Sequence, residues 1–146
     1  MMFINVKKLN DNAKLPCRAT EVSAGADLCA CIDEAVVLMP GDRKLVPTGI
    51  AIAVPNGYGG FVFARSGLSS KFGVSLANCV GVIDSDYRGE VKISVINHSS
   101  EPYTIKNGER IAQLVVMPVD LCEYGFTNEL DETDRGTGGF GSTGMM

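Results

Sequence analysis

A glycine-rich segment near the C-terminus combines the residue types that bind a nucleotide. Residues 135–144 (RGTGGFGSTG) hold five glycines, one arginine, one phenylalanine and three hydroxyl side chains. Glycines let backbone amides approach phosphate oxygens, Arg, Ser and Thr donate further hydrogen bonds, and a phenyl ring can lie on a base. A flexible tail that never orders is the alternative for such a composition.

A second segment, residues 81–91 (GVIDSDYRGEV), places Asp84, Asp86 and Tyr87 in a turn between apolar runs. Paired acids in a turn commonly do no more than cap and solvate it. The chemical interpretation is that one carboxylate holds and deprotonates a water molecule while the tyrosine ring lies against a sugar or base.

Three further segments each leave a functional and a structural interpretation open. Arg65 and Ser66 stand where a strand ends and a short helix begins, so the amides there bind phosphate or simply start a helix. Asp27 lies in a turn of small residues and could be merely structural. Gln113 interrupts an apolar strand, and its buried amide must find a core or ligand partner or cost about 1–3 kcal/mol.

Composition limits the partners of these segments. The chain has 146 residues, 45% of them apolar and 21% charged, which is enough for one domain over 1–146 with a real core. Its net charge of -4 and pI near 4.9 argue against a nonspecific nucleic-acid or membrane-surface protein, because both need a basic face. A polyanionic ligand must therefore meet local positive charge.

The chain shows neither an apolar stretch of about 20 residues nor a signal-peptide pattern at its start. We therefore expect an intracellular protein, cytoplasmic, or nuclear if the source is eukaryotic or viral. The five cysteines are odd in number and lack C-x-x-C spacing, so a disulfide framework is not expected. Cys29 and Cys31 have no second Cys or His pair to complete a metal site, and the single histidine, His98, falls in a predicted turn.

Short β-type runs between turn residues predict an all-β fold, a sandwich, jelly roll or barrel. The one plausible helix covers 66–72, and 114–117 is apolar enough to be buried on both faces. Hydrophobic runs stop at residue 120, which predicts a β core over 1–119 and an extended C-terminal arm over 120–146. The predicted strands are 3–9, 35–38, 44–47, 50–54, 60–64, 91–97 and 111–117.

Taken in chain order, the five segments closely resemble the five motifs of the trimeric deoxyuridine triphosphatase (dUTPase) family. The resemblance covers nearly the whole chain, and its third and fifth motifs are highly specific. One residue departs from the pattern, because Ala64 stands where the family usually has proline before Arg-Ser-Gly. This changes backbone rigidity but no catalytic group. The matching segments are 24–28 (AGADL), 65–67 (RSG), 81–91, 109–114 (ERIAQL) and 135–144.

The resemblance implies a β jelly roll that forms a homotrimer, with three active sites at subunit interfaces. The arm of one subunit would close over a site built by the other two. The implied reaction is Mg²⁺-dependent hydrolysis of dUTP to dUMP and pyrophosphate, which clears dUTP from the nucleotide pool and supplies dUMP for dTMP synthesis. Local contacts from a metal and cationic side chains would outweigh the distant net negative charge.

Motif matching also implies a role for each site residue. Asp84 would activate the water that attacks the α-phosphorus, and Tyr87 would stack on the deoxyribose and exclude a 2'-hydroxyl. Mg²⁺ would be held mainly by substrate phosphates, with Asp27 touching its water shell, and Asp86 would be structural. The uracil edge would be read by Asn78 and the backbone of Gly81, Val82 and Ile83. Phosphates would be met by Arg65, Ser66, Gly67, Gln113, Arg135, Ser142 and Thr143, with Gly141 in the same lid and Phe140 over the uracil.

Two other functions fit parts of this pattern. A dCTP deaminase-like enzyme shares the fold and trimeric design, but Asp84 and Tyr87 match the hydrolase motif, and a zinc deaminase would need an H-x-E with a C-x-x-C pair. A noncatalytic nucleotide sensor would not need the intact Asp84. We further expect the arm to be mobile alone and to order over bound nucleotide as a lid, because 135–146 has little apolar surface to offset its ordering entropy.

Overall fold

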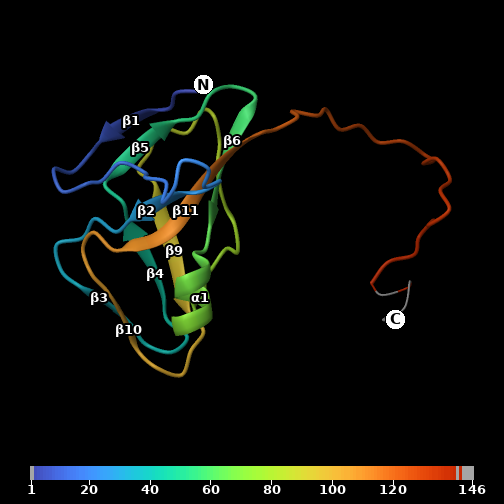
Figure 1. The fold of residues 1–146 in the computed structure, drawn as a ribbon. Coiled ribbons are helices and arrows are strands. Elements are labelled where there is room, and N and C mark those ends of the chain that lie inside the picture. The colour runs from blue at the N-terminus through green and yellow to red at the C-terminus, as the bar shows by residue number, and fades with distance from the viewer. Residues whose placement is uncertain (1, 141, 143–146) are drawn as a thin grey trace.

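The computed structural model describes residues 2–140 and 142, and these form eleven strands and one short helix (Figure 1). The elements follow one another as β1 Asn5–Lys8, β2 Ala26–Cys29, β3 Val36–Leu38, β4 Arg43–Pro47, β5 Ile50–Ala53, β6 Tyr58–Phe63, α1 Ser66–Phe72, β7 Val74–Leu76, β8 Gly81–Ile83, β9 Lys92–Asn97, β10 Tyr103–Ile105 and β11 Arg110–Pro118. No described helix is long and apolar enough to cross a membrane.

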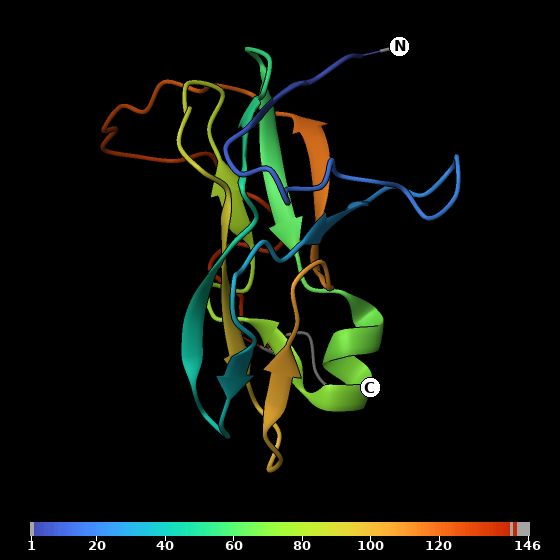
Figure 2. The same ribbon diagram turned by 90° about the vertical axis from the view of Figure 1, so that its left-hand side faces the viewer.

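All strand pairs are antiparallel, and they form four small sheets that together build a jelly roll. The largest has the order β2-β11-β6-β8, the next β4-β9-β7, and β1-β5 and β10-β3 are separate pairs. Figure 2 shows these strands gathered into one body with α1 at its lower end. The expected all-β fold is confirmed.

The core follows from alternation along the strands. In β9, Ile93, Val95 and Asn97 are buried while the intervening residues face outward, as predicted for a half-buried strand. Each fully buried Leu, Ile or Val contributes about 1.5–3 kcal/mol by leaving water, so this row stabilises the fold substantially. Its partners across the interior include Leu28, Leu38, Val46, Ile52, Ile105, Ile111 and Leu114.

Strand β11 holds the largest sheet together because it pairs with β2 on one side and β6 on the other. The prediction that 114–117 is buried on both faces is wrong for the single chain. Leu114 is buried, but Val115, Val116 and Met117 are only partly covered. Strands β2 and β6 occupy the two edges of β11, whereas no layer of the described residues fully covers its second face.

All seven predicted strand runs overlap observed strands, and the predicted helix matches α1. The strands β2, β7, β8 and β10 were not predicted. They are only three or four residues long, and β2 contains an aspartate while β8 begins with glycine. Such short segments give a weak local strand signal and become strands because a partner strand supplies their hydrogen bonds.

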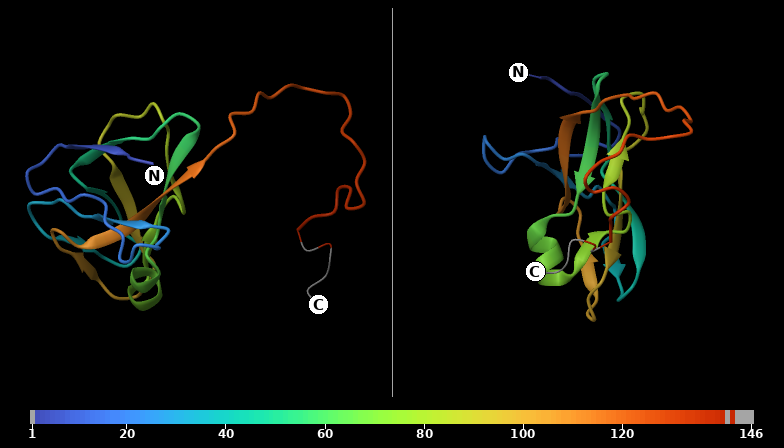
Figure 3. Two further views of the ribbon diagram at one scale, coloured as in Figure 1. Left: turned by 45° about the horizontal axis from the view of Figure 1, so that its top comes forward. Right: turned by 90° about the vertical axis from the view of Figure 1, so that its right-hand side faces the viewer.

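The C-terminal arm leaves the body after Val119, whose backbone N–H donates to the Gly57 carbonyl at 2.9 Å. Beyond it, the described residues form no helix or strand, and they extend away from the body (Figures 1 and 3). Within the described arm, the hydrogen bonds join arm residues to one another. Leu121, Tyr124 and Phe126 are therefore largely exposed in one chain.

Asn97 is a fully buried polar side chain with every hydrogen-bonding group satisfied. Its Nδ2 donates to the carbonyls of Leu38 and Glu101 at 3.0 and 2.7 Å, and its Oδ1 accepts from Ser99 N–H and Oγ at 2.9 and 2.8 Å. It therefore fixes the end of β9 against β3 and the following turn.

We expect Asn97→Ala to lower the free energy of unfolding by about 2–4 kcal/mol, because it removes the Asn97 donor to the carbonyl of buried Leu38 and the acceptor of the Ser99 N–H. Urea unfolding at fixed protein concentration measures this. The neighbouring His98 is exposed, so His98→Ala is the matched control and should change stability by less than about 0.5 kcal/mol. Equal unfolding midpoints for the two variants would contradict this assignment.

Candidate active site

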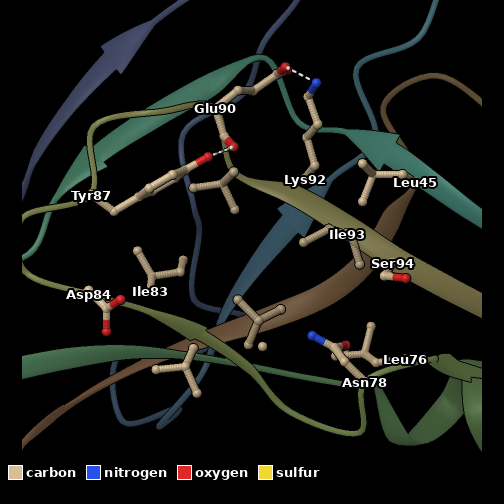
Figure 4. A pocket seen from close by; sticks show the side chains of 14 residues that line it. Leu45, Leu76, Asn78, Ile83, Asp84, Tyr87, Glu90, Lys92, Ile93 and Ser94 are labelled. Carbon is tan, nitrogen blue, oxygen red and sulfur yellow. Dashed lines mark hydrogen bonds and ion pairs between the residues drawn. The ribbon is translucent and has the colours of Figure 1, made fainter.

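A cavity of about 340 Å³ lies beside β8 and the loop that follows it. This volume is within the range of small-molecule sites. Leu76 of β7 and Ile93 of β9 give the cavity apolar walls (Figure 4). Polar groups come from the residues that flank β8 and from Lys92 and Ser94 of β9. The residues that line it include Leu45, Val62, Leu76, Asn78, Gly81, Val82, Ile83, Asp84, Tyr87, Glu90, Lys92, Ile93 and Ser94. Sequence-predicted Asn78, Asp84, Tyr87 and the Gly81–Ile83 strand are thus brought together.

A tight turn delivers Asn78 to this cavity. Cys79 has a φ of 62°, a left-handed conformation that is uncommon for a residue with a side chain. The Val80 N–H donates to the Asn78 carbonyl at 2.6 Å, and the chain then returns as β8 to pair with β6. Asn78 and Asp84 therefore flank β8, one before it and one directly after it.

The loop after β8 positions an acid and an aromatic ring. The Tyr87 N–H donates to the Asp84 carbonyl at 3.2 Å, which closes a turn and leaves the Asp84 carboxylate exposed at the cavity. The Tyr87 hydroxyl donates to the Glu90 carbonyl at 3.0 Å, so the ring lies back along its own loop (Figure 4). The ring remains 45% exposed, which leaves a face for a ligand. Asp86 is exposed and does not line the cavity.

A second group of site residues gathers where β2, β11 and the end of β6 meet. The Asp27 carboxylate accepts from Arg65 Nε at 2.8 Å through one oxygen and from Arg110 NH1 at 3.1 Å through the other. Asp27 lies in strand β2, so its predicted place in a turn is wrong. Its side chain is only 13% exposed, and two cations compensate its charge.

Gln113 links the strand β11 to the segment that carries Arg65. Its Nε2 donates to the Ala64 carbonyl at 2.9 Å, which is the structural partner that the sequence left open. A Cβ on Gly25 would lie 2.3 Å from Gln113 Oε1, so a side chain at position 25 would displace the Gln113 amide. Ser66 and Gly67 follow Arg65 directly and are exposed at the start of α1.

Sequence reasoning missed the supporting residues Arg110, Glu109 and Tyr103. The Tyr103 hydroxyl donates to Glu109, and burial together with this bond raises the pKa of Tyr103. Its ring packs on Phe72 of α1 with centroids 5.1 Å apart, which ties the helix to β10. The acid and cation in the ERIAQL segment were the available signal. The partner of Arg110, Asp27, lies 83 residues away in sequence, whereas Glu109 and Tyr103 are only six residues apart.

The described part of the glycine-rich motif forms only local turns. Arg135 Nε donates to the Gly138 carbonyl at 2.8 Å, and the Ser142 N–H donates to the Gly139 carbonyl at 3.0 Å. The Phe140 ring is fully exposed. Gly141 and Thr143, also predicted for this site, lie outside the described residues.

One chain therefore presents three separate parts of a site. The cavity carries Asn78, Asp84 and Tyr87, the Asp27 group carries Arg65 and Gln113, and the arm carries Phe140. No residue of the Asp27 group lines the cavity, and the arm extends away from both (Figure 3). The three parts therefore do not meet within the part of one chain that the structure describes.

The donor set fits a magnesium ion that takes most of its oxygens from a polyphosphate. Among the described residues, no three His, Cys, Asp or Glu side chains cluster in a metal-binding arrangement. Asp27 is the one carboxylate in the cationic group, and both its oxygens already accept hydrogen bonds. Mg²⁺ bound by one or two carboxylates plus phosphates suits such a site. Burial raises the pKa of the nearby Cys29 thiol, which favours its neutral form.

Comparison with known proteins agrees with the arrangement of the motifs. The family model described as dUTPase matches residues 11–144. The chain is 56% identical over 133 residues to the deoxyuridine 5'-triphosphate nucleotidohydrolase of Desulfitobacterium hafniense, covering 90% of this chain and 88% of that protein.

Two similar solved structures come from bacteriophages. A dUTPase variant of Staphylococcus bacteriophage 80alpha with dUpNHpp has a TM-score of 0.90 and 31% identity, covering 99% of both chains. A dUTPase variant from phage phi11 of S. aureus, described with a structural Mg(II) ion, has a TM-score of 0.79 and 28% identity over 88% of this chain and 98% of that one. Given the family-model match and the identity over most of the chain, this protein belongs to the dUTPase family.

Proposed function

We propose that this protein hydrolyses dUTP to dUMP and pyrophosphate. The observation that carries the proposal is the convergence of Asn78, Asp84 and Tyr87 on one cavity of nucleoside size. The family membership and a similar structure with the dUTP analogue dUpNHpp support the same substrate. An assay of the pure protein with dUTP and dCTP that detects pyrophosphate and ammonia tests this directly, since a deaminase would release ammonia instead.

In the proposed reaction, Asp84 accepts a proton from a water molecule. The water oxygen attacks the α-phosphorus, and the bond between that phosphorus and the oxygen bridging to the β-phosphate breaks. Pyrophosphate leaves with the electrons of that bond, and dUMP remains. The exposure of the Asp84 carboxylate at the cavity supports this role, because a general base must reach the attacking water.

The nucleoside would be recognised by shape and by hydrogen bonds. The Asn78 amide and the backbone of Gly81–Ile83 would read the uracil edge, because both flank the same cavity. Cytosine would then meet a donor where an acceptor is needed, and the methyl of thymine would lack space. The Tyr87 ring would lie against the deoxyribose and leave no room for a 2'-hydroxyl.

The triphosphate would be met by the second cationic group, where Arg65, Ser66 and Gln113 stand close to the start of α1. Mg²⁺ bound to the phosphates would neutralise their charge and make the α-phosphorus easier to attack. Asp27 would hold Arg65 in place, and it could contact the metal's water shell only by sharing its occupied oxygens. The phage structure described with a structural Mg(II) ion supports a metal in this family.

The complete site would require a homotrimer. In one chain, the cavity, the Asp27 group and the arm are apart, and the partly covered face of β11 offers apolar surface to a second copy. The arm, with Arg135 and Phe140, would close over a site built by other subunits. The match to the dUpNHpp structure covers 99% of this chain, so it extends through the arm.

Asp84→Asn should lower kcat by about 10²-fold or more while dUTP still binds, because it removes the general base but keeps size and polarity. Pyrophosphate release gives kcat, and calorimetry with a nonhydrolysable analogue gives affinity. Asp86→Asn is the matched control, since Asp86 is an exposed acid of the same loop outside the cavity. Near-normal turnover of Asp84→Asn would refute the role of Asp84.

Tyr87→Ala should raise kcat/KM for UTP relative to dUTP by about tenfold or more, because steric exclusion of a hydroxyl needs bulk beside the sugar. Both substrates are assayed separately at matched Mg²⁺ concentration. An unchanged ratio would place sugar discrimination at another residue.

Shared sites predict complementation between two inactive chains. Full-length Asp84→Asn chains and chains ending at Asp134 should regain activity when refolded together, because about one quarter of the sites in random trimers receive both an intact Asp84 and an intact arm. Sedimentation checks that mixed trimers form. Background activity in proven mixed trimers would show that each chain completes its own site.

A further inference from the structure

We propose that Gly89 and Glu90 are positioning residues that set the choice between deoxyribonucleotide and ribonucleotide by fixing the Tyr87 ring. This inference rests on the proposed function, in which that ring excludes the 2'-hydroxyl. It adds two residues that need not touch the nucleotide themselves.

The Tyr87 ring occupies the space that a side chain at position 89 would fill. A Cβ on Gly89 would lie 2.3 Å from Tyr87 Oη, 2.5 Å from Cζ and 2.9 Å from Cε2. Contacts this short do not persist between carbon atoms, so either the ring or the loop must move. The backbone of Gly89 is not in the left-handed region, so the obstacle to a side chain is this contact and not the local φ.

Glu90 holds the same hydroxyl end of the ring by a hydrogen bond. Its carbonyl accepts the Tyr87 hydroxyl at 3.0 Å, and its carboxylate Oε1 accepts the Gly49 N–H at 2.9 Å (Figure 4). The second carboxylate oxygen lies 3.6 Å from Lys92 Nζ. One residue later, the Val91 carbonyl accepts the buried Thr48 hydroxyl at 2.5 Å.

These contacts anchor the acceptor of the Tyr87 hydroxyl to the turn between β4 and β5. A tyrosine ring has only two side-chain torsions, so a fixed hydroxyl and a close glycine together leave it one orientation. Steric exclusion of a 2'-hydroxyl depends on the location of the ring edge. A ring that is free to tilt would admit UTP while still covering the sugar of dUTP.

Gly89→Ala tests the first half of the proposal. We expect the ratio of kcat/KM for dUTP to that for UTP to fall by about tenfold, mostly through a gain on UTP, with the trimer and its melting temperature retained. His98→Ala is the control, because His98 is exposed and does not line the cavity. In a Tyr87→Ala background, Gly89→Ala should change the ratio no further, since the ring it displaces is absent.

Glu90→Ala and Glu90→Gln test the second half without crowding the loop. Glutamine keeps an Oε1 that can accept the Gly49 N–H, so Glu90→Gln should hold the ratio within about twofold, while Glu90→Ala lowers it about three- to tenfold. These variants also decide the matter if Gly89→Ala does not fold. Three results together support the proposal. Gly89→Ala or Glu90→Ala lowers the ratio, neither lowers it further in a Tyr87→Ala background, and Glu90→Gln keeps it near that of the unchanged protein.

Two results would overturn it in distinguishable ways. In the first, the unchanged protein hydrolyses dUTP, but Gly89→Ala and Glu90→Ala have the same ratio of kcat/KM for dUTP to that for UTP as the unchanged protein. The positioning role is then wrong and the proposed function stands. If the unchanged protein does not hydrolyse dUTP, the proposed function and this inference both fail.

Discussion

The pairing of β11 with β2 and β6 is the constraint on which the rest of the structure depends. It brings Asp27, from an early strand, between Arg65 and Arg110, and it sets Gln113 against the Ala64 carbonyl. The negative charge of an aspartate side chain that is only 13% exposed would destabilise the fold if it were unpaired, but two guanidinium groups compensate that charge. The same strands fill the interior with Leu28, Ile111 and Leu114, so the charged group and the core are built by one set of backbone hydrogen bonds.

The cavity is formed in a different way, by a tight turn before the three-residue strand β8 and a short loop after it. Strand β8 is too short to be stable alone, and its pairing with β6 holds the turn at Cys79 and the loop at Asp84 in fixed positions. The loop then folds on itself through Tyr87 and Glu90, and Glu90 joins it to the β4–β5 turn. A rigid scaffold with polar groups on its loops is the usual arrangement for recognition.

Separation of the site into three parts has a physical consequence for charge. The arm from Asp120 to Asp134 carries six acids and no Lys or Arg, while the Asp27 group on the body carries Arg65 and Arg110. The net negative charge of the chain is thus concentrated in the arm, and the proposed polyanionic substrate would meet local cations on the body. At the short distances of a bound nucleotide, such local contacts dominate over net charge.

The sequence by itself determined the β-rich fold, the long strands, the helix α1 and the chemical identity of the motifs, because alternation, turn residues and glycine-rich composition are local signals. It did not reveal β2, β7, β8 or β10, nor the partners of Asp27 and Gln113. Those depend on segments brought together from up to 83 residues apart, so no local pattern encodes them. Only the tertiary structure decided that Asp27 lies on a strand, that Gln113 donates to Ala64, and that β11 keeps one face partly open. The reason is that packing and long-range pairing, rather than propensity, choose the partner of each polar group.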